Sequence, residues 1–258
     1  KNNLFLEGAV TAFSSNPSST QSGSLSFDSG KIKEEVRKIV GESAVDRSTA
    51  ILLVHHYSNA GAAYLGHGSE PDLTNDYASG FGVGGTCLSY LESTLRHEFG
   101  HAFAKLDEEY VIYNGGRIPE DQINVIKAEQ NDFGWWTNVD FTDNLSFIRW
   151  ADYVSDSRYA SENIGAYEGA GTYETGVWRP TENSFMNMNW GGYNAPSRET
   201  IYRRIHKLAY GASWEFDRET FKQWDTQKTK SSVRTTTNQA DNQRPVRRAE
   251  RDYHIISR

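Results

Sequence analysis

Residues 97–110 read HEFGHAFAKLDEEY, and the first five of them carry the strongest signal in this chain. On a helix, positions i and i+4 lie on one face, so the imidazoles of His97 and His101 can bind one Zn²⁺ at about 2.0–2.1 Å. Glu98 lies beside them, where a carboxylate can take a proton from water that zinc activates. We therefore expect a zinc ion on His97 and His101, with Glu98 as the general base.

The surrounding residues 88–106 (LSYLESTLRHEFGHAFAKL) predict a helix. At 100° per residue, five apolar side chains fall within an arc of roughly 80°. This stripe is expected to pack on the core while the two histidines face a cleft on the opposite side. Its members are Leu91, Leu95, Phe99, Ala102 and Leu106.

A catalytic zinc site normally has three protein ligands and one position open to water. Asp107 stands six residues after His101, which is the spacing of the third ligand in the metzincin pattern HExxHxxGxxH or its Asp variant. Ala104 occupies the position of the glycine in that pattern. A continuing helix would carry residues 107 and 108 more than about 10 Å along its axis from the zinc. The chain must therefore bend after about Ala104.

Two blocks of the sequence resemble the IgA-peptidase family of metzincin-like zinc metallopeptidases. Residues 97–110 are similar to the family's HEFGHxFxxLxDEY, and residues 164–190 (IGAYEGAGTYETGVWRPTENSFMNMNW) resemble its EGA-x-Y, G-x-x-R-P and Met-turn segments. The resemblance implies a zincin fold, a zinc cofactor and hydrolysis of peptide bonds in protein substrates. It also implies a secreted, cell-surface or periplasmic bacterial protein, a Met-turn at Met186 (with Met188 as second choice), and supporting roles for Glu109 and Tyr110.

The third ligand remains open between two neighbours. The family's acidic residue aligns with Glu108, whereas metzincin spacing favours Asp107. In other zincins the third ligand is a Glu from a later helix, so Glu162 and Glu168 are further alternatives.

The composition argues against several other classes of protein. The chain has 258 residues and a net charge of −7, which argues against a nucleic-acid binder because phosphates require a basic face. The single cysteine excludes an intramolecular disulfide, and no apolar run is long enough to span a membrane. The oligomeric state is not predicted. The chain starts at Lys1, which we interpret as a processed or trimmed end.

Other elements follow from patterns along the chain. Strands are expected at residues 1–11 and 49–54. A helix is expected over KIKEEVRKIV (31–40), after Asp28-Ser29-Gly30, with its stop at Gly41. Further helices are expected at 119–130 and 197–209, the last one starting at Ser197. Residues 56–86 are glycine-rich and are expected to be loop with a hidden edge strand.

The last part of the chain differs in character from the rest. Residues 227–258 contain eight Lys or Arg and three Asp or Glu, so this segment is about +5 and the remainder about −12. We therefore predict a catalytic domain at 1–226 and a polar, basic extension at 227–258 that is mostly solvated, or alternatively inhibitory.

Together these observations predict an α+β fold of the zincin (metzincin-like) type: a small twisted mixed sheet, an active-site helix and a Met-turn. The expected function is that of a zinc-dependent metalloendopeptidase. The alternative is a catalytically silent zincin scaffold that binds protein or glycan.

Overall fold

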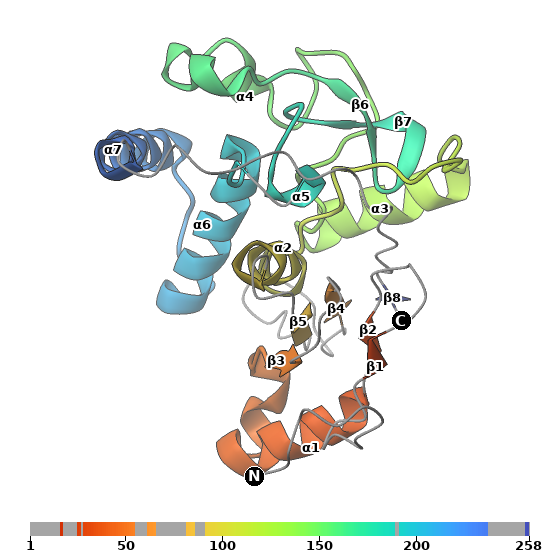
Figure 1. Cartoon of the computed structure of the whole chain (residues 1–258). Helices are drawn as coiled ribbons and strands as arrows, with labels where there is room; N and C mark the ends of the chain where they lie inside the picture. Colours follow the sequence, from red (N-terminus) through yellow and green to blue (C-terminus); the bar gives the residue numbers. More distant parts are fainter. Residues whose placement is uncertain are drawn as a thin grey trace.

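The computed structural model describes residues 16–17, 25–26, 28–54, 61–65, 81–85, 91–188, 191–236 and 256–257 (Figure 1). Helices and short strands occur together in these residues, which confirms the α+β class. No helix among them is long and apolar enough to cross a membrane.

A four-stranded sheet forms one layer of the molecule. Its order is β3 (Ile51–Val54), β5 (Phe81–Gly85), β4 (Gly61–Leu65) and β8 (Ile256–Ser257). β5 is parallel to β3 and antiparallel to β4, while β4 and β8 are parallel, so the sheet is mixed as predicted. The strand predicted at 49–54 is confirmed as β3. The prediction of loop with an edge strand at 56–86 is partly wrong, because the described residues of this stretch form two strands and one of them, β5, lies inside the sheet. A separate antiparallel pair is formed by β1 (Asn16–Pro17) and β2 (Leu25–Ser26), and the strand predicted at 1–11 lies outside the described residues.

Helix α1 (Ser29–Val40) ends before Gly41 as predicted, but it begins two residues earlier than the predicted stretch at 31–40. The side chain of Asp28 accepts a hydrogen bond from the backbone N–H of Lys31, at 3.0 Å, and caps the first turn. Gly41 follows the last helical residue at φ 80°, in a left-handed conformation that a residue without Cβ adopts at little cost. A 3-10 helix, η1 (Glu42–Arg47), then leads toward β3.

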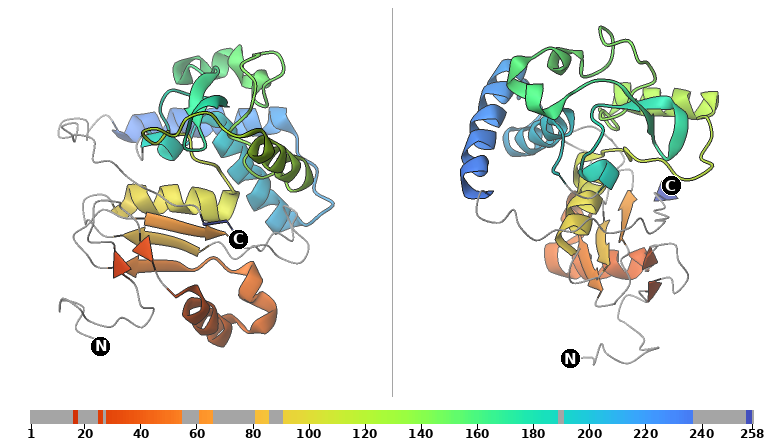
Figure 2. Two further views of the ribbon diagram at one scale, coloured as in Figure 1. Left: turned by 90° about the vertical axis from the view of Figure 1, so that its right-hand side faces the viewer. Right: turned by 45° about the horizontal axis from the view of Figure 1, so that its top comes forward.

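Helix α2 (Leu91–Ala104) contacts β4 and β5 with one side, and the sheet lies between α2 and α1 (Figure 2). The predicted division into an apolar core face and a histidine face is only partly correct. Ala102 and Leu106 are buried, but Phe99 is 37% exposed, whereas His97 and His101 are 1% exposed. The histidines are buried for a tertiary reason: Glu108 and the Phe185 carbonyl group contact them, and α5 and α6 pack against α2.

The second half of the chain is loop-rich and has its own apolar clusters. One is centred on Trp135 and Val177, the other on Trp150 and Phe221. The helix predicted at 119–130 is confirmed as α3 (Glu120–Asp132). The other elements of this region are α4 (Ala151–Val154), η2 (Ser157–Glu162), the hairpin strands β6 (Tyr167–Ala170) and β7 (Tyr173–Arg179), and α5 (Phe185–Met188).

Two long helices follow. α6 (Ala195–Tyr210) starts before Ser197, contrary to the prediction, because Asn194 is the N-cap: its Oδ1 accepts the N–H of Ser197 at 3.1 Å. Pro196 lies in the first turn, where its missing N–H costs no helical bond. α7 (Arg218–Thr236) runs across the predicted domain boundary at 226/227, so the helix continues into the predicted basic extension.

Candidate metal centre

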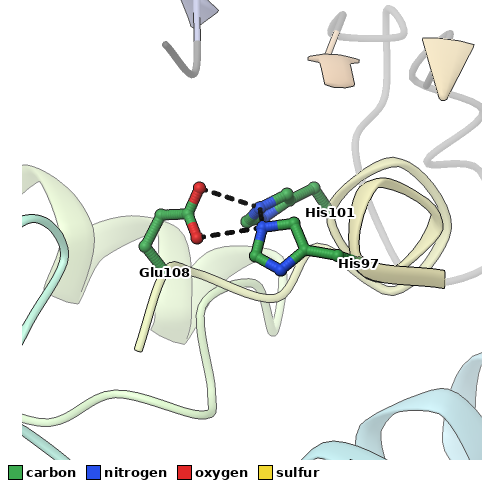
Figure 3. Close-up of side chains that lie close together, drawn as sticks. All are labelled: His97, His101 and Glu108. Atoms are coloured by element: carbon green, nitrogen blue, oxygen red, sulfur yellow. Dashed lines mark hydrogen bonds and ion pairs between the residues drawn. The ribbon is translucent and has the colours of Figure 1, made fainter. Parts of the chain in front are cut away.

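Three buried side chains converge beside α2: His97, His101 and Glu108 (Figure 3). The two Nε2 atoms are 3.0 Å apart, and each lies 3.1 Å from one carboxylate oxygen of Glu108. Ligand atoms about 2.0–2.1 Å from a tetrahedral zinc would be about 3.3–3.4 Å apart, close to these separations. The group can therefore hold a metal ion with little rearrangement. It is the one group of this kind that the described residues contain.

The hydrogen bonds of the two imidazoles fix where their lone pairs point. His97 Nδ1 lies 2.7 Å from the carbonyl oxygen of Phe185, and His101 Nδ1 lies 2.6 Å from that of Leu106. A carbonyl oxygen only accepts hydrogen bonds, so each Nδ1 must carry the proton. In the neutral rings, both Nε2 lone pairs then point toward the same place, next to a carboxylate. Neighbouring lone pairs repel, and a shared cation removes this repulsion.

The pKa values of the three side chains also indicate that a cation is favoured between them. Burial alone would lower the pKa of His97 and His101, but the Glu108 carboxylate raises the pKa of both. Burial would raise the pKa of Glu108, yet the two imidazoles lower it to about 2. A positive charge between these three groups is thus strongly favoured, whether a proton or a metal cation supplies it.

The chain reaches Glu108 through a sharp bend at the end of α2, as the sequence analysis required. Lys105 has φ 53°, and its N–H donates to the carbonyl oxygen of His101 at 3.0 Å, which is a left-handed helix cap without glycine. The carbonyl oxygen of Lys105 accepts the N–H of Trp136 at 2.8 Å. Next to the bend, the buried side chain of Leu106 packs with that of Met186.

The position of this bend explains which acid joins the histidines. The HExxHxxGxxH pattern has its turn residue at position 104 and its ligand at 107. Here the left-handed residue is Lys105 and the acid in the group is Glu108, so both are displaced by one residue. The distance along the chain from the turn to the acid is unchanged.

Asp107 lies outside the three-residue group. Its Oδ1 accepts the N–H of Glu108 at 2.8 Å, and its own N–H donates to Asn138 Oδ1 at 2.8 Å. Burial raises the pKa of Asp107 to about 7. The Asp107 side chain therefore stabilises the backbone after the bend, and it is not one of the three residues that converge.

The two more distant acids proposed as ligands are also engaged elsewhere. Glu162 forms an ion pair with Arg198 at 2.7 Å and accepts the N–H of Ala195. Glu168 Oε1 accepts the N–H of Gly176 at 3.0 Å. Neither belongs to the group at His97.

Glu98, the expected general base, is 2% exposed, and its Oε1 has no hydrogen-bond partner. Burial is the main cause that raises its pKa to about 8. Strand β4 passes directly over this carboxylate at Gly61: a Cβ built there would come closer to Glu98 Oε1 than real Cβ atoms come to a neighbour. A buried carboxylate without a partner has a high free energy, and such groups concentrate where proton transfer occurs.

The expected Met-turn residue lies below the histidines. Met186 is fully buried, and its Sδ would lie 2.8 Å from a Cβ built at Gly100, between His97 and His101. Its neighbour Phe185 supplies the carbonyl oxygen bound to His97. Met188, the second choice, is 39% exposed. The sequence had no signal for the carbonyl groups of Phe185 and Leu106, because any residue type can supply a carbonyl oxygen.

We expect Gly100→Ala to lower the free energy of unfolding although alanine is the better helix former. Helix propensity alone favours Ala by about 1 kcal/mol. The new methyl group would press on Met186 Sδ and on Tyr193, whose hydroxyl oxygen would be 3.1 Å away, and such overpacking costs about 1–3 kcal/mol. Denaturant titration measures the change. The control is Gly30→Ala in the exposed first turn of α1, where the new Cβ would lie 3.2 Å from the Asp28 side-chain oxygen and would meet no buried group. A Gly100→Ala protein as stable as Gly30→Ala would contradict the described packing.

A scan of protein-family models finds none that matches this chain, and a search of curated proteins finds no similar sequence. The assignment of a function therefore rests on the residues of the site.

Proposed function

We propose that this protein is a zinc-dependent metallopeptidase whose metal is held by His97, His101 and Glu108. One observation carries the proposal: two imidazoles with inward lone pairs and a carboxylate converge within about 3 Å, next to the unpartnered carboxylate of Glu98. A structural site would use a fourth protein ligand, whereas three ligands with a neighbouring base are typical of a hydrolytic site.

The donor set favours zinc among the common metals. Two neutral imidazole nitrogens and one carboxylate are preferred zinc ligands, whereas calcium and magnesium favour sites built from oxygen alone. The second ring nitrogen of each histidine is bound by a carbonyl oxygen, an arrangement that holds metal-ligating imidazoles in place.

A bound zinc ion would supply Lewis acidity, lowering the pKa of water and polarising a substrate carbonyl. The oxygen of the attacking water would bond to the carbonyl carbon, and Glu98 would accept the proton that this water loses. The same carboxyl group would return that proton to the nitrogen as the C–N bond breaks. Burial raises the pKa of Glu98, which favours the uptake of a proton from water.

The choice of peptide bonds as substrate rests on the sequence. Residues 97–110 and 164–190 resemble two blocks of the IgA-peptidase family, and we propose a metzincin-like fold with a Met-turn at Met186 on the same basis. A metal-dependent hydrolase of other substrates would share the site but would lack these blocks. The location outside the cytoplasm stays a prediction.

Metal analysis combined with a proteolysis assay tests this function. We expect about one zinc per chain, cleavage of an unfolded protein substrate, loss of cleavage with a chelator and recovery when zinc returns. Zinc at 100 times its Kd should also raise the free energy of unfolding by about 2.7 kcal/mol, which a thermal melt can detect.

Two results would count against the proposal. A chain that binds no metal would remove the site itself. Stoichiometric zinc without cleavage of a broad substrate panel would instead favour the catalytically silent scaffold. His206→Ala is a suitable control, because His206 lies on α6 with its Nδ1 on the Tyr202 carbonyl oxygen and should affect neither measurement.

A further inference from the structure

A second buried acid lies directly after the proposed ligand. Glu109 is fully buried, and its carboxylate is in contact with four side chains from three separate segments. Oε1 lies 3.0 Å from Asn138 Nδ2, 3.0 Å from Asn194 Nδ2 and 3.4 Å from Ser197 Oγ. Oε2 lies 2.6 Å from Ser184 Oγ and 2.9 Å from Asn194 Nδ2.

The orientation of the two amides shows that they donate to Glu109. Asn194 Oδ1 accepts the N–H of Ser197 as the N-cap of α6, so its Nδ2 must face the carboxylate. Asn138 Oδ1 accepts the N–H of Asp107, and its Nδ2 also donates to the Asp107 carbonyl oxygen. Both amides are thereby fixed. Glu109 is surrounded by donors and acts as an acceptor at both oxygens.

These contacts connect Glu109 to two of the proposed metal ligands. It follows Glu108 in the chain, so fixing its side chain restricts the backbone that carries the ligand. Its N–H also donates to the carbonyl oxygen of Met186 at 2.8 Å. Ser184 Oγ, which contacts Glu109, accepts the N–H of Met186 at 3.1 Å, and between these two residues lies Phe185, whose carbonyl oxygen binds His97.

We propose that Glu109 is a positioning residue: its carboxylate holds the Ser184–Met186 segment and the start of α6 against the loop after α2, and so fixes the Phe185 carbonyl oxygen and Glu108 around the metal. This inference rests on the proposed function, because it takes His97, His101 and Glu108 as ligands. It assigns Glu109 no contact with substrate or metal.

Glu109→Gln tests the inference with almost no change in shape. Asn194 Nδ2 lies within 3.0 Å of both oxygens, so the new amide group faces a fixed donor in either orientation. We expect zinc affinity, measured by chelator competition, to fall about 10–100-fold. The visible absorption of the Co²⁺-substituted protein should also change, since it reports the geometry around the metal.

Glu199→Gln is the matched control. Glu199 is another buried acid, on α6, and its carboxylate accepts from Tyr153 and from Arg218, the latter at 3.0 Å. It should lower stability while leaving zinc affinity and the Co²⁺ spectrum unchanged. If Glu109→Gln does not fold, Ser184→Ala removes the hydroxyl group that donates to Glu109 and accepts the Met186 N–H, and it should weaken zinc binding several-fold.

The outcomes separate this inference from the proposed function. Wild-type affinity and an unchanged Co²⁺ spectrum in Glu109→Gln, or in Ser184→Ala if the first variant does not fold, would overturn the positioning role. Equal losses of affinity in Glu109→Gln and Glu199→Gln would overturn it as well, because they would reflect stability alone. A wild-type protein that binds no metal would instead remove the proposed function.

Discussion

Glu98→Gln is expected to reduce peptidase activity by between about 10²-fold and 10⁴-fold while zinc content stays at the wild-type level. This range is the usual contribution of a positioned general acid or base. The substitution keeps the shape of a side chain that is 2% exposed, but an amide takes up no proton from water. Turnover of a protein substrate and zinc analysis of the same preparation provide the two measurements.

Glu92→Gln is the matched control for this experiment. Glu92 lies on the same helix, is exposed, and pairs with Arg96 on the surface. The same chemical change there should leave activity and zinc content unaltered. Undiminished turnover in Glu98→Gln would exclude the proposed role of Glu98, whatever the metal content.

The second large effect is expected at the third ligand. We expect Glu108→Gln to lower zinc affinity by more than about 100-fold. Loss of a residue that only supports a ligand lowers affinity by less than this. The carboxylate is 1% exposed and faces both imidazoles, so a neutral amide removes the negative charge that balances the metal. Chelator competition on the purified protein measures the change.

Asp107→Asn distinguishes the two acids that the sequence left open. Asparagine keeps the oxygen that accepts the Glu108 N–H, so the bend should persist and zinc affinity should fall by at most about 10-fold. The reverse result, with zinc lost from Asp107→Asn and kept by Glu108→Gln, would assign the ligand to Asp107. Equal effects in both variants would indicate that neither side chain alone completes the site.

The sequence was informative at positions where only a few residue types can do what the structure requires. Two histidines at helical spacing predicted the pair at His97 and His101, and the rise of a helix required the bend that the structure has at Lys105. Gly41 marked the end of α1 because glycine readily takes the positive φ that follows a helix, whereas the cap at Asp28 was found only in the structure.

The choice between Asp107 and Glu108 depended on a one-residue difference in the position of the bend. A glycine would have marked that position, but here a lysine takes the left-handed conformation. Its backbone is held by the hydrogen bond from Trp136 and by the packing of Leu106 on Met186, which are tertiary contacts that no local pattern encodes. The burial of His97 and His101 on the side opposite the apolar stripe is likewise tertiary, because Phe185 and Glu108 contact these histidines there.

The three proposed ligands all lie within residues 97–108 of the chain, and the bend at Lys105 brings Glu108 back to the two histidines. Closing so short a loop costs little entropy, so an unfolded chain keeps these side chains near one another. A metal ion captured by this segment therefore binds before distant parts of the chain have met, and binding to the unfolded chain reduces the net stabilisation that the metal gives the fold. The carbonyl oxygen of Phe185, by contrast, belongs to a residue 88 positions after His97 in the chain. Folding would thus raise the affinity for a metal ion that is already bound, because it adds the distant contacts that orient the ligands.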